Sequence, residues 1–200
     1  MNSYILGLMA TDGSMKLDRG YYNEVIEIVD EQLIADIATY YNTHYLYRSR
    51  VVKDKVRHFY RVTIPKSVYL GNEECFRGDK SGLFNIYEKS NKAEFMRGVF
   101  DGDGTVCEFA NSDTLLRIGF SVNSKHLDIL KIITSFMDEN GIKFNNYFDK
   151  RGNGCYYLSI NRKDDVAKFF NLIYNDAKLY LKRKYNVFVS HGFPDLVTGQ

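Results

Sequence analysis

The stretch EFMRGVFDGDGTV, from Glu94 to Val106, decides the interpretation of this sequence. It begins with apolar residues at helical spacing and ends with two aspartates set between glycines. A weaker copy, YILGLMATDGSM, runs from Tyr4 to Met15. Aligning the copies places Asp12 on Asp103, an offset of 91 residues in a chain of 200. The sequence therefore predicts an internal repeat, each half opening with a helix that ends in Asp–Gly.

The residues that follow each copy also correspond. In the first half we expect two strands within Met15–Val29, a helix over Asp30–Tyr41, and a hairpin formed by HYLYRSR and HFYRVTIP. In the second half we expect strands at Thr105–Phe109 and Leu115–Asn123, a helix over Ser124–Glu139 capped by Ser124, a hairpin of Phe144–Asp149 and Tyr156–Ile160, and helices at Asp164–Tyr174 and Lys178–Val189.

This order predicts an α+β fold of two pseudo-symmetric αββαββα halves, each with a four-stranded antiparallel sheet. Residues 1–70 would form the first half, 71–91 a linker and 92–200 the second half. Alternation assigns the sheet faces: Ile118 and Phe120 point to one side, and Arg117 and Ser121 to the other. One face should pack on helices, and the other should carry polar, basic and aromatic groups.

The two helices that end in Asp–Gly should pack against each other. Gly7 and Gly98 each stand four residues before another small residue, a spacing that allows close helix contact. Such packing would bring Asp12 and Asp103 together at the helix ends. Two neighbouring carboxylates repel unless a positive charge lies between them, so the arrangement predicts divalent metal ions. The glycine after each aspartate would let the chain turn sharply and let a bulky substrate approach.

Composition limits the remaining possibilities. The net charge of +2 is too small to indicate a polyanion partner by itself, so the placement of charges must decide. Cys75, Cys107 and Cys155 lie far apart, which argues against zinc and favours free thiols in a reducing compartment. No apolar run approaches the ~18 residues of a membrane span, and Tyr4–Ala10 lacks the pattern of a secretory signal.

At these residues the sequence resembles the LAGLIDADG homing endonucleases, in their single-chain, two-motif form. FMRGVFDGDG keeps the basic residue, the glycine, the aromatic residue and both aspartates, and YLKRKY near the end also matches. ILGLMATDG keeps the final Asp–Gly but has Ala10 where the motif has its earlier acidic residue. The resemblance covers nearly the whole chain. It implies a monomer whose two sheets straddle double-stranded DNA, and metal-dependent cleavage of both strands at a long, asymmetric site.

The resemblance also implies roles for particular residues. The metal, Mg²⁺ or another divalent cation, would be held by Asp12 and Asp103, with the backbone carbonyls of Thr11 and Gly102 as further ligands. Lys184 matches the active-site lysine of the family, and Lys80, placed between the first hairpin and the second motif, is its expected partner. Asp30 and Ser124, opening the second helix of each half, match positions that order active-site water. No histidine is required by this chemistry, so His44, His58, His126 and His191 are interpreted as surface or half-buried residues.

DNA contacts are expected on the polar sheet faces, because a ribbon of antiparallel strands fits the major groove. Arg48, Arg50 and Arg117 are the strongest candidates, since arginine recognises guanine and also grips phosphate. The full set is Lys16, Asn23, Glu27, Arg48, Arg50, Arg61 and Thr63 in the first half, and Arg117, Ser121, Asn146, Lys150, Tyr157 and Ser159 in the second.

Three alternatives remain open at this point. The first is an RNA maturase that assists splicing of its host intron, with that intron RNA as a partner. The second is a DNA-binding regulator that has lost cleavage, which would lack a metal carboxylate. The third, an intein-embedded endonuclease, would need splicing blocks, whereas the sequence begins at Met1 and ends in LVTGQ. The expected location is inside a cell: the cytoplasm of a microbe or phage host, or an organelle.

Overall fold

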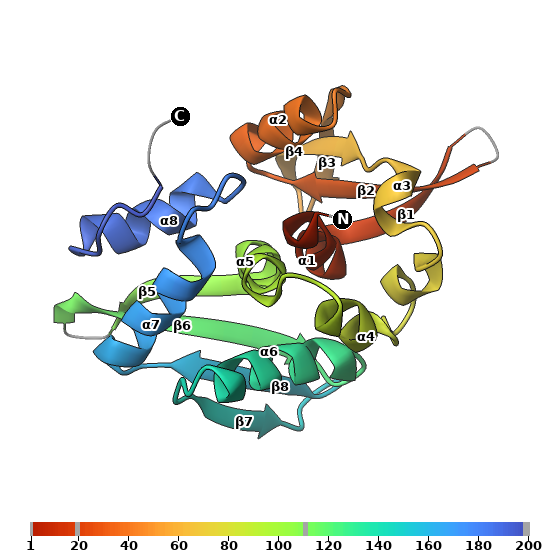
Figure 1. Ribbon diagram of the computed structural model, residues 1–200. Helices are drawn as coiled ribbons and strands as arrows, with labels where there is room; N and C mark the ends of the chain where they lie inside the picture. Colours follow the sequence, from red (N-terminus) through yellow and green to blue (C-terminus); the bar gives the residue numbers. More distant parts are fainter. Residues whose placement is uncertain (1, 19–20, 110–111, 198–200) are drawn as a thin grey trace.

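The computed structural model describes residues 2–18, 21–109 and 112–197, with the side chains of residues 15–18, 21–22, 52, 109 and 112–115 left aside. Two helices, α1 (Ser3–Asp12) and α5 (Lys92–Asp103), lie side by side in the centre and are seen nearly end-on in Figure 1. A four-stranded sheet lies on either side of this pair (Figure 1). The predicted α+β fold of two antiparallel sheets is confirmed.

Each half follows the predicted element order. The first sheet has the strand order β1-β2-β4-β3 and the second β5-β6-β8-β7, so the two halves share one topology. The first half contains α1, β1 (Gly13–Asp18), β2 (Tyr21–Ile28), α2 (Glu31–Tyr40), β3 (Tyr45–Val52), β4 (Lys55–Thr63) and the short α3 (Lys66–Tyr69). The second contains α5, β5 (Gly104–Phe109), β6 (Ser112–Asn123), α6 (Leu127–Glu139), β7 (Asn145–Asp149), β8 (Cys155–Ile160), α7 (Lys163–Tyr174) and α8 (Lys182–Ser190).

The segment between the halves is partly helical. It holds a 3-10 turn, η1 (Glu73–Phe76), and a helix, α4 (Leu83–Glu88). η1 packs against β1, while α4 packs against α5 and α6. The expected linker therefore lies against both halves, and it carries Lys80 between η1 and α4.

Both central helices begin and end in the same way. The side chains of Asn2 and Asn91 cap their N-termini by accepting backbone N–H hydrogen bonds at 3.2 and 3.1 Å. Gly13 and Gly104 follow their C-termini with φ of −71°, an ordinary extended conformation. A Cβ at either glycine would overlap the preceding helical turn. The glycines are thus required for space, and the sharp-turn reason expected from the sequence does not apply.

Two helix starts differ from the prediction. α6 begins at Leu127 with His126 at its N-cap, because the Ser124 hydroxyl donates instead to the Asn153 carbonyl at 2.6 Å. α8 begins at Lys182, four residues later than expected, because the backbone before it is used by α5. The Leu181 N–H donates to Asp101 at 2.8 Å, and the Leu179 carbonyl accepts from Arg97 at 3.0 Å.

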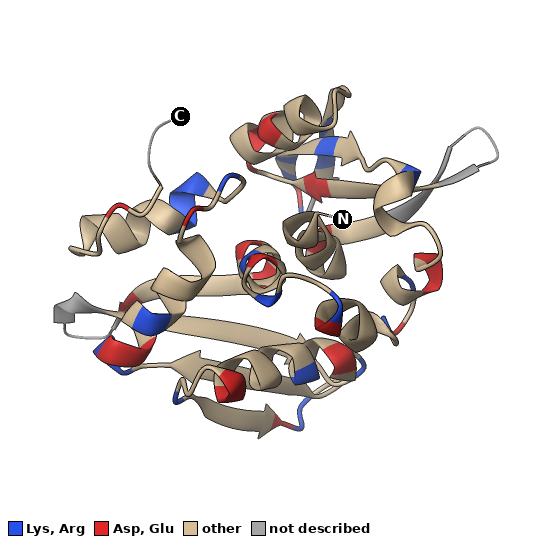
Figure 2. Ribbon diagram, viewed as in Figure 1, with Lys and Arg blue, Asp and Glu red and all other residues tan. Residues whose placement is uncertain are grey.

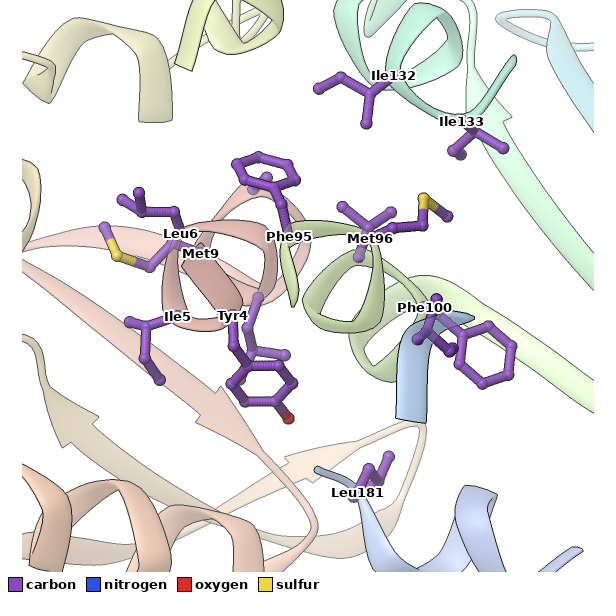
Figure 3. Close-up of a cluster of buried hydrophobic side chains, with 14 of the residues drawn as sticks. Tyr4, Ile5, Leu6, Met9, Phe95, Met96, Phe100, Ile132, Ile133 and Leu181 are labelled. Atoms are coloured by element: carbon purple, nitrogen blue, oxygen red, sulfur yellow. The ribbon is translucent and has the colours of Figure 1, made fainter. Parts of the chain in front are cut away.

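One core connects the two halves. Figure 3 shows buried side chains extending from α1 and α5 in both directions, Tyr4 and Phe95 among them. Ile132 on α6 and Leu181, before α8, belong to the same cluster (Figure 3). Because the central helices contribute to both sides, the helix ends are held at a fixed place between the sheets.

Candidate functional site

Glycines bring the backbones of α1 and α5 into direct contact. A Cβ on Gly7 would overlap the Phe95 carbonyl, and a Cβ on Gly98 would overlap the Tyr4 carbonyl. Any larger residue would push the helices apart. The close packing expected from the small-residue spacing is therefore present in the structure.

The helix ends place Asp12 and Asp103 at the centre of the molecule. Each is the last residue of its helix, with Asp12 half-buried and Asp103 exposed. A Cβ on Gly102 would lie 2.9 Å from Asp12 Oδ2, so α5 passes directly beside the Asp12 carboxylate. Burial and the charge of Asp103 raise the pKa of Asp12 to about 6. The two carboxylates therefore repel each other, and a cation between them would relieve that repulsion.

Lys80 and Lys184 occupy equivalent places at the two helix ends. Lys80 Nζ donates to the carbonyls of Ala10 at 2.5 Å and Thr11 at 3.3 Å. Lys184 Nζ donates to the carbonyls of Asp101 at 2.8 Å and Gly102 at 3.5 Å, which the repeat aligns with Ala10 and Thr11. The ammonium groups thus satisfy carbonyls that a helix C-terminus leaves unpaired. The pairing of Lys80 with Lys184 that the sequence predicted matches this geometry.

Both lysines are withdrawn from solvent beside the two aspartates. Burial lowers the pKa of Lys184 to about 8, while Asp101, Asp12 and Asp103 oppose this shift. Burial also lowers the pKa of Lys80, and Asp103, Asp12 and Glu24 oppose it. The site therefore holds two partly desolvated cations next to two carboxylates, a distribution that suits the negatively charged oxygens of a phosphate.

The donor set at the helix ends fits a hard divalent cation. Asp12 and Asp103 offer carboxylate oxygens, and the carbonyls of Thr11 and Gly102 receive only the longer of the lysine hydrogen bonds. Oxygen ligands of this kind suit Mg²⁺ or Ca²⁺. The described residues contain no cluster of three or more His, Cys, Asp or Glu side chains able to hold a metal by themselves. Water and phosphate oxygens would therefore complete the coordination.

Asp101, the earlier acidic residue of the strong motif, has a structural role. It is fully buried and accepts hydrogen bonds from the Tyr4 hydroxyl at 3.0 Å, the Tyr174 hydroxyl at 2.9 Å and the Leu181 N–H. Burial raises its pKa, which these hydrogen bonds oppose. Asp101 thus ties the segment before α8, and with it Lys184, to the motif helix.

A pocket beside Asp12 is lined by an arginine, Arg183, that the sequence prediction did not include. Asp12, Asp30, Phe59 and Arg183 line it together. Asp30 caps α2 by accepting from the Leu33 N–H at 3.1 Å, and Arg183 Nε lies 3.8 Å from Asp30 Oδ2. Arg183 comes from the second half but faces an aspartate of the first. Its position directly before Lys184 in the motif-like YLKRKY was the signal that could have identified it.

A second cavity, of about 120 Å³, lies beside Asp103. Lys80, Ser121, Asn123 and His126 are among its lining residues. Ser124 is not among them, although the strand register makes it the counterpart of Asp30. His126, interpreted from the sequence as a surface or half-buried residue, is half-buried and lines this cavity, with its Nδ1 3.2 Å from the Asp79 carbonyl.

The first sheet presents a strongly basic face away from the helices. The register places Arg50 opposite Arg57 and Arg48 opposite Phe59, with Arg61 two residues further on. Like charges directly opposite each other destabilise a sheet, so this face is suited to an anionic partner. Blue segments mark these strands in Figure 2. The sequence prediction did not include Arg57. It named Arg48 and Arg50 of β3 and Arg61 of β4.

Glu27 lies among these arginines and binds two of them. Its carboxylate accepts from Arg61 Nε at 2.8 Å and pairs with Arg50 at 3.1 Å. The Arg50 guanidinium also stacks over the Phe59 ring, 4.1 Å from its centre. Glu27 therefore fixes the direction of two guanidinium groups on the exposed face. Asn23 and Thr63, also predicted, share this face, whereas the side chain of Lys16 lies outside the described residues.

The second sheet presents a face that is mostly uncharged. Arg117, Ser121, Tyr157 and Ser159 share this face as predicted, and β6 and β8 are mostly tan in Figure 2. Asn146 was assigned to it incorrectly. The register pairs Asn146 with buried Leu158, on the helix side, so its neighbours Asn145 and Tyr147 share the face of Arg117. Asn146 itself is exposed because β7 is an edge strand. Lys150 lies in the loop after β7.

The second half of the chain is similar to a known protein family. The family model of the LAGLIDADG-like domain matches residues 90–174. The predicted resemblance is confirmed, and the model covers α5, the second sheet and α7.

Several solved structures share the fold of nearly the whole chain. The homing endonuclease I-WcaI, bound to its DNA recognition sequence, matches with a TM-score of 0.65 and 13% identity, over 92% of this chain and 84% of that one. I-SmaMI, bound to an uncleaved DNA target with calcium ions, matches at 0.58 and 12%, over 96% and 89%. I-DmoI, in complex with DNA and Ca, matches at 0.56 and 21%, over 95% and 96%.

No curated protein sequence gives a significant match. Within the described residues, no helix is long and apolar enough to span a bilayer. Cys75, Cys107 and Cys155 are free thiols; Cys75 and Cys155 are half-buried, whereas Cys107 is exposed. The compared structures named above contain DNA, and they give no support to an intron RNA partner.

Proposed function

We propose that this protein is a site-specific DNA endonuclease that makes a metal-dependent double-strand break in a long, asymmetric duplex site. The observation that carries the proposal is the paired helix end. Asp12 and Asp103 end two helices that pack against each other, and each helix end carries its own lysine, Lys80 half-buried and Lys184 buried. Two such ends match a reaction that must occur twice, once on each strand.

The chemistry follows from the groups at the helix ends. Asp12 and Asp103, with the carbonyls of Thr11 and Gly102, would hold divalent cations such as Mg²⁺. When bound, such a cation supplies a water of lowered pKa and neutralises charge on the phosphate. I-SmaMI and I-DmoI were solved with calcium, and I-DmoI also with manganese, which supports a divalent cation here.

The protein's own groups would act on the phosphate and on water. Lys80 and Lys184 place ammonium groups where negative charge develops on the phosphate oxygens. Asp30 retains carboxylate lone pairs beside Asp12, where it can orient a water molecule. Because the two sheets carry different side chains at corresponding positions, a single chain would recognise two unlike half-sites.

The decisive experiment is cleavage of a randomised duplex library by the purified protein with magnesium. Sequencing of the cut ends should return one long site without palindromic symmetry, cut on both strands. Chelation of the metal should stop cleavage, and mass measurement should show a monomer on the DNA. Failure to cut any duplex at several divalent metals would refute the proposal. A regulator that has lost cleavage is disfavoured because both metal carboxylates are present.

A further inference from the structure

Lys80 is held at the helix end by a backbone conformation that lysine rarely adopts. Its φ is +62°, in the left-handed region that favours glycine. Its N–H closes a turn by donating to the Arg77 carbonyl at 2.9 Å, and its ammonium reaches the carbonyls of Ala10 and Thr11. A strained residue of this kind persists only where its surroundings hold it in place. The contacts around this turn therefore determine where the ammonium group lies.

The start of α6, in the second half of the chain, contacts the chain on both sides of Lys80. Before Lys80, the Asp79 carbonyl lies 3.2 Å from His126 Nδ1, and because a carbonyl only accepts, this nitrogen carries the proton. After Lys80, the Phe84 N–H donates to Asp128 Oδ2 at 3.1 Å. His126 is the N-cap residue of α6, and Asp128 lies in its first turn. The helix therefore binds the chain one residue before Lys80 and four residues after it.

Asp128 supplies a cap that α4 does not form by itself. The N-cap residue of α4 is Gly82, which has a φ of +89° and no side-chain hydrogen bond to offer. The Phe84 N–H would be one of the unpaired donors of a helix start, and Asp128 accepts it from another helix. One turn further along α6, the Lys131 ammonium lies 3.7 Å from the centre of the Phe84 ring. Two groups of α6 thus fix the start of α4, directly after the Lys80 turn.

The second-half lysine is placed by its own half. Lys184 lies in the first turn of α8, in ordinary helical backbone. Leu181, directly before that helix, donates its N–H to Asp101 of α5 at 2.8 Å. Lys80, in contrast, lies in a linker turn that the second half holds. The two ammonium groups meet equivalent carbonyls, but the place of both depends on the second half of the chain.

We propose that His126 and Asp128 are positioning residues that hold the left-handed turn of Lys80 against the end of α1. This inference rests on the proposed nuclease function. His126 lines the cavity of about 120 Å³ together with Lys80 and Asn123, the last residue of β6. The His126 N–H also donates to the Asn123 carbonyl at 2.9 Å. The first-half lysine is thus connected through α6 to the second sheet, which couples cleavage of one strand to the half of the protein that holds the other.

The test uses the full chain and the duplex site recovered from the library, with each strand labelled separately. His126→Ala combined with Asp128→Ala should slow cleavage of one strand by about 10–100-fold, because a small displacement of a catalytic group has effects of this size. That strand should be the one slowed by Lys80→Met, with DNA affinity nearly unchanged. His126→Asn and Asp128→Asn, which keep a donor and an acceptor, should retain the wild-type rate. Leu127→Ala, at an exposed position between the two, is the control and should leave both strands unchanged.

Hydrogen exchange of the metal-free protein without DNA tests the same contacts independently of catalysis. The amides of Lys80 and Phe84 should exchange faster in the double alanine variant than in wild type, while those of α1 keep their protection. In a Lys80→Met background the double alanine change should cause little further loss on the affected strand, whereas in a Lys184→Met background its effect should persist.

Three results would overturn the inference: equal slowing of both strands, wild-type rates on both strands in the double alanine variant, or unchanged exchange at Lys80 and Phe84. A wild-type protein that cuts no duplex would instead refute the proposed function. The exchange measurement would then still decide whether α6 holds the Lys80 turn.

Discussion

The two sheets share a topology but carry different side chains on the faces turned away from the central helices. The first carries Arg50 opposite Arg57, with Glu27 holding Arg50 and Arg61 in place. The second offers mainly serine, asparagine and tyrosine around Arg117. The helix ends show the opposite trend, since both keep an aspartate and a lysine on matching carbonyls. Under the proposed function, the comparison indicates that catalysis constrains the centre of the molecule, while the two sheets have diverged for recognition.

The largest expected effect tests the equality of the two helix ends. Asp12→Asn and Asp103→Asn should each abolish double-strand cleavage, by about 10³-fold or more, because each removes a charged metal ligand at nearly constant shape. DNA binding should survive, since the sheets are unchanged and repulsion at the centre falls. Cleavage assays and gel-shift titrations measure the two properties separately. Full double-strand cleavage by either variant would break the assignment.

The centre should also respond to pH. The pKa of Asp12 is raised to about 6, so in the metal-free protein its carboxyl keeps a proton to a higher pH than a free aspartate does. A bound cation must displace that proton. Metal affinity should therefore be full above about pH 7 and fall by roughly tenfold per pH unit below pH 6, if one proton competes with the metal. Calorimetric titration with magnesium between pH 5 and 8 measures this. Affinity that stays constant down to pH 4.5 would contradict the expected crowding of the carboxylates.

Much of this arrangement could be predicted from the sequence, because the repeat encodes it twice. Asp–Gly at two equivalent positions identified the helix ends. The place of Lys80 before the second motif indicated that it is the first-half counterpart of Lys184. Asn146 was misplaced although Phe144 and Phe148, two residues to either side, share its face; alternation from these phenylalanines would have put it on the helix side. His126 was missed because the Ser124 hydroxyl is used by a loop carbonyl, which lets the helix start later. The fully buried carboxylate of Glu24 on β2 was not predicted, because alternation predicts apolar residues on the buried side of a strand.

The next largest effect tests the difference between the sheets. Arg57→Ala, on the first sheet, should weaken binding to all duplexes alike and reduce the salt slope by about one contact, if Arg57 meets a phosphate. Arg117→Ala, on the second, should instead relax preference at one or two base pairs, costing about 1–3 kcal/mol at the correct base. Binding titrations at several salt concentrations, on the cleaved site and on unrelated duplexes, distinguish the two. Identical behaviour of the two variants would remove the proposed division between the sheets.

The smallest effect concerns Glu27, whose negative charge stands on a face expected to meet DNA. Its carboxylate lies on this face but forms ion pairs with Arg50 and Arg61. Glu27→Gln should therefore have two opposing consequences. Loss of a negative charge should strengthen binding to unrelated DNA a few-fold, on the order of one extra phosphate interaction. Release of the two guanidinium groups should lower the preorganisation of the face and weaken discrimination at nearby base pairs. The ratio of affinities for the cleaved site and for unrelated DNA should therefore fall, even where absolute affinity rises. Val56→Ala, an exposed position on the opposite side of the same sheet, serves as the control and should leave this ratio unchanged. A higher ratio for Glu27→Gln would mean that Glu27 only repels DNA and does not organise the arginines.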